Sequence, residues 1–198
     1  PEAIKMAPVV LELKANPKFK VTTVVTAQHR EILDQVLELF HIEPDVDLNT
    51  MKANQTLTGI TVRVLQGLEP VLLEKRPDIV LVQGDTSTAF VAGLAAFYQK
   101  IPVGHIEAGL RTDKIYDPFP EEMNRRLLSR LAEMQFPPTK WAYNNLAQEG
   151  LVFKDTYITG NTVADALKLI VAGLPEGVPT DLKSVASCEE EASATQVD

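Results

Sequence analysis

The chain has 198 residues, enough for one sizeable domain or two small ones. Its hydrophobic content of 45% and charged content of 23% are ordinary for a soluble globular protein, and its net charge of −8 argues against a nucleic-acid binder, since such proteins usually carry a basic face. No apolar run has the length of a membrane span, no signal-peptide pattern opens the chain, and the single cysteine, Cys188, cannot form an internal disulfide. We therefore expect a cytoplasmic protein that binds neither nucleic acid nor membrane.

Helices and strands are predicted to alternate along the chain. Amphipathic spacing predicts the helices, and short runs rich in Val and Ile predict the strands. The clearest strands, 77–84 and 101–109, are apolar at consecutive positions, as in strands that are covered on both faces of a parallel sheet. In chain order the predicted elements are helix 1–16, strand 20–27, helix 31–40, helix 57–75, strand 77–84, helix 86–100, strand 101–109, helix 120–132, strand 133–138, helix 139–150, strand 155–160 and helix 162–173. This order predicts an α/β fold, a Rossmann-like parallel sheet with flanking helices.

The domain is predicted to cover residues 1–173. A doubly wound domain normally begins with a strand, whereas this chain begins on a helix, so we expect the first strand to be absent. Residues 174–198 lose the apolar periodicity and are rich in acidic residues, Ser, Ala and Pro, which predicts a disordered tail.

Polar residues follow the predicted strands, where parallel sheets place their ligands. Asp85 follows one strand, in GDTST, and could either cap the next helix or serve a ligand. Glu107 follows another and could either pair with a nearby arginine or serve a ligand. Glu121 stands at a predicted helix start, where an acidic residue also complements the helix dipole. Together the three predict a group of carboxylates on one rim, where like charges raise the pKa of at least one.

Other candidates have simpler interpretations. Lys5 could balance the charge of a phosphate, or be a solvated helix lysine. His105 is predicted to be a core histidine, since no second His or Cys nearby suggests a metal site. The glycine fingerprints GxGxxG and GxxxxGK[ST] are absent, which argues against a nicotinamide-binding module.

Several motifs, in order and spacing over about residues 1–170, resemble the amino-terminal half of the non-hydrolysing UDP-N-acetylglucosamine 2-epimerases. They are PEAIKMAP, TAQHREILDQVLELF, DIVLVQGDTSTAF, IPVGHIEAGLRT, PFPEEMNRRL and YITGNTVADAL. The resemblance implies the first domain of a glycosyltransferase-B type fold with two Rossmann-like domains, the second of which we expect to be absent. It also implies a homodimer, no cofactor and no metal.

The activity implied is the interconversion of UDP-N-acetylglucosamine and UDP-N-acetylmannosamine, by elimination and re-addition of UDP with inversion at C2, for the synthesis of cell-envelope polysaccharide precursors. By the same resemblance, Asp85, Glu107 and Glu121 are the catalytic carboxylates, and Lys5, Asp85 and Glu107 contact the substrate. Gln28 and His29 match a regulatory site that binds a second UDP-N-acetylglucosamine in some bacterial members.

We expect the isolated chain to be inactive or unstable, since half of the implied cleft is missing. Two alternatives remain open. The chain could belong to another nucleotide-sugar enzyme, a glycosyltransferase or a hydrolysing epimerase, or it could be a non-catalytic remnant that serves oligomerisation.

Overall fold

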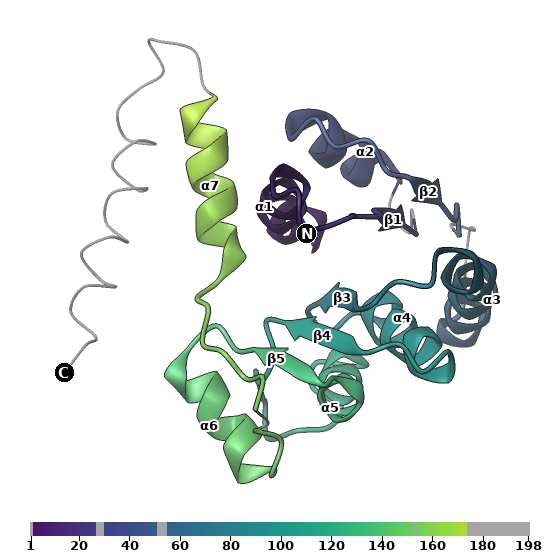
Figure 1. Cartoon of the computed structure of the whole chain (residues 1–198). Helices are drawn as coiled ribbons and strands as arrows, with labels where there is room; N and C mark the ends of the chain where they lie inside the picture. Colours follow the sequence, from purple (N-terminus) through teal and green to yellow (C-terminus); the bar gives the residue numbers. More distant parts are fainter. Residues whose placement is uncertain (1, 27–29, 51–54, 153, 174–198) are drawn as a thin grey trace. The chain divides into compact units, whose positions relative to one another are not determined.

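The computed structural model describes residues 2–26, 30–50, 55–152 and 154–173 (Figure 1). The described residues form two compact units. The first consists of residues 2–21, 34–43 and 161–173, and the second of residues 22–26, 30–33, 44–50, 55–152 and 154–160. Among the described residues, no helix combines the length and the apolar character needed to cross a membrane.

The first unit contains helices α1 (Glu2–Ala15) and α7 (Thr162–Ala172), which pack against each other, and the end of α2 (Arg30–Leu39). The predictions of helices at 1–16, 31–40 and 162–173 are confirmed. Helix α7 begins where predicted because the side chain of Asn161 accepts a hydrogen bond from the backbone N–H of Val163. The apolar core of the first unit consists of Ala7, Val10, Val36, Phe40, Ile42 and Ala166.

The second unit contains two parallel sheets (Figure 1). Strand β1 (Val24–Val25) pairs with β2 (Val46–Asp47). The larger sheet has the order β3-β4-β5, formed by β3 (Val80–Gln83), β4 (Val103–Ile106) and β5 (Met134–Phe136). Consecutive parallel strands joined by helices confirm the α/β fold that the sequence predicts.

Four helices of the second unit flank these strands: α3 (Leu57–Lys75), α4 (Ser87–Tyr98), α5 (Glu121–Leu131) and α6 (Lys140–Gln148). Threonine side chains at 56, 86 and 139 cap the starts of α3, α4 and α6. Helix α4 packs on β3 and β4 and lies between α3 and α5. The main core fills this layer, with Ile60, Val64, Leu68, Leu72, Val82, Ala89, Val91, Ala95, Ala96, Val103, Leu128 and Ala132.

The strands are shorter than the sequence predicts. The strand predicted at 20–27 is reduced to β1, and the one predicted at 155–160 to a single bridge between Thr156 and Gln135. The second difference arises because its partner β5 is itself only three residues long. Strand β2 was not predicted, since two residues show no periodicity. The tail predicted at 174–198 lies outside the described residues, and the domain boundary at 173 stays a prediction.

Candidate active site

Asp85 stands in the turn that joins β3 to α4. Gly84 takes the left-handed conformation, φ 75°, and turns the chain away from the sheet. Thr86, not Asp85, caps α4, because its hydroxyl accepts a hydrogen bond from the N–H of Ala89 at 3.2 Å. The capping role considered for Asp85 is therefore wrong, and its carboxylate is available for other contacts.

Helix α5 holds Asp85 at both its side chain and its backbone. Arg125 Nη2 lies 2.5 Å from Asp85 Oδ2, and Asn124 Nδ2 donates to the carbonyl of Asp85 at 2.9 Å. Burial raises the pKa of Asp85, and the negative charges of Glu121 and Glu107 raise it further, while the Arg125 guanidinium opposes the rise. Glu107 and Glu121 therefore lie near enough to Asp85 for their charges to act on its carboxylate.

Glu107 follows β4 directly and has the left-handed conformation, with φ 65°, which is unusual for a residue other than glycine. Its backbone N–H donates to the carbonyl of Phe136 in β5 at 3.0 Å. Its side chain reaches the neighbouring strand on the other side, where Gln83 Nε2 donates to Glu107 Oε2 at 2.5 Å. Groups from all three strands of the larger sheet thus meet at Glu107.

A close contact with α6 supports the loop that follows Glu107. Gly109 has φ 85°, and a Cβ atom at this position would lie 2.2 Å from the carbonyl oxygen of Ala142. Asn145 Nδ2 donates to the carbonyl of Gly109 at 2.9 Å. Only glycine fits here, so the exit from β4 is fixed against the helix.

Glu121 and Glu122, neighbours at the start of α5, have different environments. Glu121 is half-buried, and its charge acts on Asp85. Glu122 is fully buried, and its carboxylate accepts from Arg126 Nε at 2.7 Å and from the N–H of Thr112 at 3.0 Å. Glu122 thus ties the loop after β4 to α5, whereas the charge of Glu121 acts on Asp85.

The arginines considered as partners of Glu107 bind other carboxylates. Arg111 Nε lies 2.8 Å from Glu149 Oε1, Arg125 pairs with Asp85, and Arg126 pairs with Glu122. All three arginines are half-buried, and Arg125 is the one that pairs with Asp85.

His105 is a core histidine, as predicted. Its side chain is fully buried in β4, and Nε2–H donates to the carbonyl of Gly84 at 2.8 Å. Within the part of the chain that the structure describes, Nδ1 has no hydrogen-bond partner. Burial lowers the pKa of His105 to about 4, so the ring is neutral at pH 7. The residues described contain no group of His, Cys, Asp and Glu suited to a metal ion.

The remaining predicted residues lie elsewhere. Lys5 belongs to α1 in the first unit, and Gln28 and His29 lie outside the described residues. Sequence reasoning missed Gln83 and Asn124, and did not connect Arg125 to Asp85. A polar residue at the end of the apolar run IVLVQ was the available signal for Gln83.

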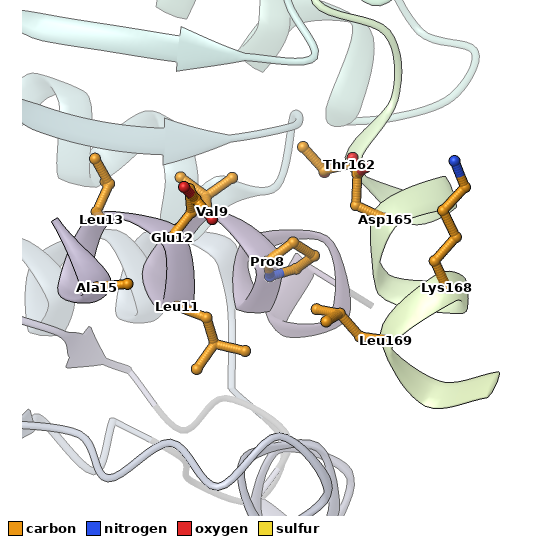
Figure 2. A pocket seen from close by; sticks show the side chains of 10 residues that line it. All are labelled: Pro8, Val9, Leu11, Glu12, Leu13, Ala15, Thr162, Asp165, Lys168 and Leu169. Atoms are coloured by element: carbon orange, nitrogen blue, oxygen red, sulfur yellow. The ribbon is translucent and has the colours of Figure 1, made fainter. Parts of the chain in front are cut away.

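The first unit also contains an open pocket of about 690 Å³ between α1 and α7 (Figure 2). Its walls are mostly apolar, and its charged lining residues are Glu12, Asp165 and Lys168. Of the predicted site residues that the structure describes, none lines this pocket.

A sequence model described as UDP-N-acetylglucosamine 2-epimerase matches residues 11–192. The UDP-N-acetylglucosamine 2-epimerase of Escherichia coli strain K12 is 58% identical over 167 residues, which cover 84% of this chain and 44% of the relative. The enzyme of the same name from Bacillus subtilis strain 168 is 54% identical over 171 residues, covering 86% of this chain and 45% of the relative. The chain therefore spans less than half the length of these curated relatives.

Solved structures agree with these matches. The UDP-GlcNAc 2-epimerase from Neisseria meningitidis, bound to UDP-GlcNAc, superposes with a TM-score of 0.85 at 51% identity, covering 97% of this chain and 50% of the other. The Methanocaldococcus jannaschii enzyme, in complex with UDP-GlcNAc and UDP, gives 0.81 at 34% identity, with 92% and 51% covered. This chain belongs to the UDP-N-acetylglucosamine 2-epimerase family.

Proposed function

We propose that this chain supplies the carboxylate part of an active site that interconverts UDP-N-acetylglucosamine and UDP-N-acetylmannosamine. The observation that carries the proposal is that Asp85 and Glu107 follow the carboxyl ends of β3 and β4, and that Glu107 and Glu121, at the start of α5, both lie near enough to act on the Asp85 carboxylate. Membership of the family supports the choice of substrate.

Inversion at C2 needs a group that removes a proton from one face of the sugar and a group that returns one to the other face. As a carboxylate takes the C2 proton, the C2–H electron pair forms the C1=C2 double bond, and UDP leaves with the electron pair of the C1–O bond. In the return step a UDP oxygen adds to C1, and a carboxyl group delivers a proton to the opposite face of C2. No atom changes its oxidation state over the cycle, so these steps need no redox cofactor.

The site has the two kinds of group that these steps use. Burial raises the pKa of Asp85, and a carboxyl group of raised pKa can hold a proton for delivery. Glu107 is held between neighbouring strands by Gln83 and the carbonyl of Phe136, as a base of fixed position should be. Glu121 is the third carboxylate of the rim.

The other roles rest on the resemblance of motifs. We assign Lys5 to the substrate phosphates and Gln28 with His29 to a regulatory site for a second sugar nucleotide. The complete enzyme is proposed to be a cytoplasmic homodimer.

A hybrid protein tests the proposal, because the chain covers only 44% of the Escherichia coli relative. In the hybrid, the 167 matched residues of that enzyme are replaced by those of this chain. Proton NMR in heavy water should show loss of the C2 proton of UDP-N-acetylglucosamine and the appearance of UDP-N-acetylmannosamine. A folded hybrid that does not exchange the C2 proton of UDP-N-acetylglucosamine would overturn the proposal.

The 198-residue chain by itself should give no exchange in the same assay, since remote binding energy positions the reacting sugar. Glu107→Gln in the hybrid should abolish exchange. Glu133→Gln is the matched control, because Glu133 is exposed.

A further inference from the structure

We propose that Gln83 is a positioning residue that holds the Glu107 carboxylate in place for proton transfer at C2. The inference rests on the proposed function. Gln83 is the last residue of β3 and is 5% exposed. In the register of the sheet it stands opposite Ile106, the last residue of β4, so its side chain reaches one residue beyond the strand to meet Glu107.

The orientation of the Gln83 amide follows from chemistry. An ionised carboxylate only accepts hydrogen bonds, so the end of the amide that faces Glu107 Oε2 at 2.5 Å is the Nε2 donor. The other end, Oε1, is buried and has no hydrogen-bond partner among the described residues. A buried oxygen without a partner is costly, and a methionine would fill this space without that cost. We therefore infer that position 83 holds an amide because the amide donates to Glu107.

Glu107 needs such a support because of its backbone. With φ 65° it occupies a conformation that side chains other than glycine rarely adopt, and its N–H is fixed by the carbonyl of Phe136. The carboxylate lies beside Gly84, where an added Cβ atom would stand 3.8 Å from Oε2. The backbone thus fixes one end of the Glu107 side chain, and Gln83 fixes the other.

The ends of β3 and β4 also support each other in the reverse direction. His105 of β4 donates to the carbonyl of Gly84, which follows β3, at 2.8 Å. Gln83 and His105 therefore form two crossed contacts that hold the turns carrying Asp85 and Glu107 in one arrangement. Because an error of about 1 Å in a reacting group can lower a rate 100-fold, such contacts bear directly on turnover.

Gln135 is a matched control within the same sheet. It is a fully buried glutamine of β5, and its Oε1 also has no partner among the residues described. Its Nε2, however, donates to the carbonyl of Ser129 at 2.7 Å and has a purely structural environment. The two glutamines thus differ in their acceptor, because Gln83 donates to the Glu107 carboxylate and Gln135 donates to a backbone carbonyl.

The first test is spectroscopic and uses the folded hybrid, labelled with ¹⁵N in its glutamine side chains. A charge-assisted bond should move one Nε2 proton of Gln83 downfield, and Glu107→Ala should abolish that shift. Glu121→Ala should leave it, and the Gln135 resonances should stay in place in both variants. If Glu107→Ala does not fold, Glu107→Gln removes the charge while keeping the shape. A Gln83 resonance that is unchanged on loss of the Glu107 charge overturns the proposal.

The second test measures turnover in the hybrid. Gln83→Met should lower kcat for C2 exchange roughly 10-fold to 100-fold with KM unchanged, because positioning acts on proton transfer rather than on binding. Gln135→Met should change kcat little. Equal kcat values for the two variants overturn the proposal. If the unsubstituted hybrid folds but does not exchange the C2 proton, the proposed function is wrong. The Gln83 resonance then still decides whether the contact with Glu107 exists.

Discussion

Arg125 joins a carboxylate of the rim to a fully buried one. Its Nη2 lies 2.5 Å from Asp85 Oδ2, and its Nη1 lies 3.4 Å from Glu122 Oε2. Since Arg125 and Glu122 belong to α5 and Asp85 to the turn after β3, the arginine fixes the helix to the carboxyl end of the sheet. Glu121 is the first residue of the same helix, and its charge acts on Asp85.

Loss of the Glu122 charge should destabilise the second unit. Glu122 is 0% exposed and pairs with Arg125 and Arg126, so Glu122→Ala removes the buried carboxylate that both arginines share and leaves them only Asp85 and Glu149. We expect the free energy of unfolding to fall by about 3–5 kcal/mol, measured by urea denaturation. The matched change Glu121→Ala should cost under about 1 kcal/mol, because a half-buried carboxylate of the rim is not part of this pairing. Equal losses in the two variants would contradict the division of roles.

His105 should make the stability of the chain depend on pH. Burial lowers its pKa from 6.5 to about 4, so between these values the unfolded chain binds a proton that the folded chain does not. The stabilisation is fully present above pH 6.5 and is lost as the pH falls toward 4, by up to about 3 kcal/mol.

Urea denaturation at several pH values measures this effect. His105→Gln should flatten the decline between pH 6.5 and 4, whereas His41→Gln, at an exposed histidine, should keep it. An unchanged pH dependence in His105→Gln would show that other groups cause the decline.

The approach of Gly109 to α6 should tolerate no side chain. A Cβ atom would lie 2.2 Å from the carbonyl oxygen of Ala142, and the residue also has φ 85°. Gly109→Ala should therefore lower the free energy of unfolding by more than about 2 kcal/mol. Gly150→Ala provides the comparison, since Gly150 has φ 68° with no atom within 4 Å of the added Cβ and should cost only about 1 kcal/mol. Equal melting temperatures of the two variants would show that the close approach of Gly109 to Ala142 does not cause the loss of stability.

The helices could be predicted because their signals are local. Thr56 and Asn161 cap helices that begin at the next residue, and the apolar spacing of α3 agrees with its observed bounds, Leu57–Lys75. The strands were harder, because pairing depends on a partner that is distant in sequence. Strand β2 has only two residues, and its pairing with β1 leaves no periodic trace.

The site likewise has some features that depend on local sequence and others that depend on residues distant in the chain. The carboxylates Asp85 and Glu107 could be predicted, since a charged residue directly after an apolar strand marks the rim of a parallel sheet. Their partners could not, because Arg125 meets Asp85 from a point 40 residues further along the chain (125 minus 85). The contact of Gln83 with Glu107 likewise depends on the register of β3 against β4, which the sequence does not state. The capping role considered for Asp85 failed because Thr86, one residue later, forms the same hydrogen bond.

The most direct measurement is proton NMR of UDP-N-acetylglucosamine in heavy water with the hybrid that carries the 167 matched residues of this chain. We predict deuterium at C2 and the appearance of UDP-N-acetylmannosamine, with loss of both in Glu107→Gln and neither lost in Glu133→Gln. Exchange that survives in Glu107→Gln, or a folded hybrid that binds the sugar nucleotide and leaves its C2 proton in place, would contradict the claim that these carboxylates perform the epimerisation.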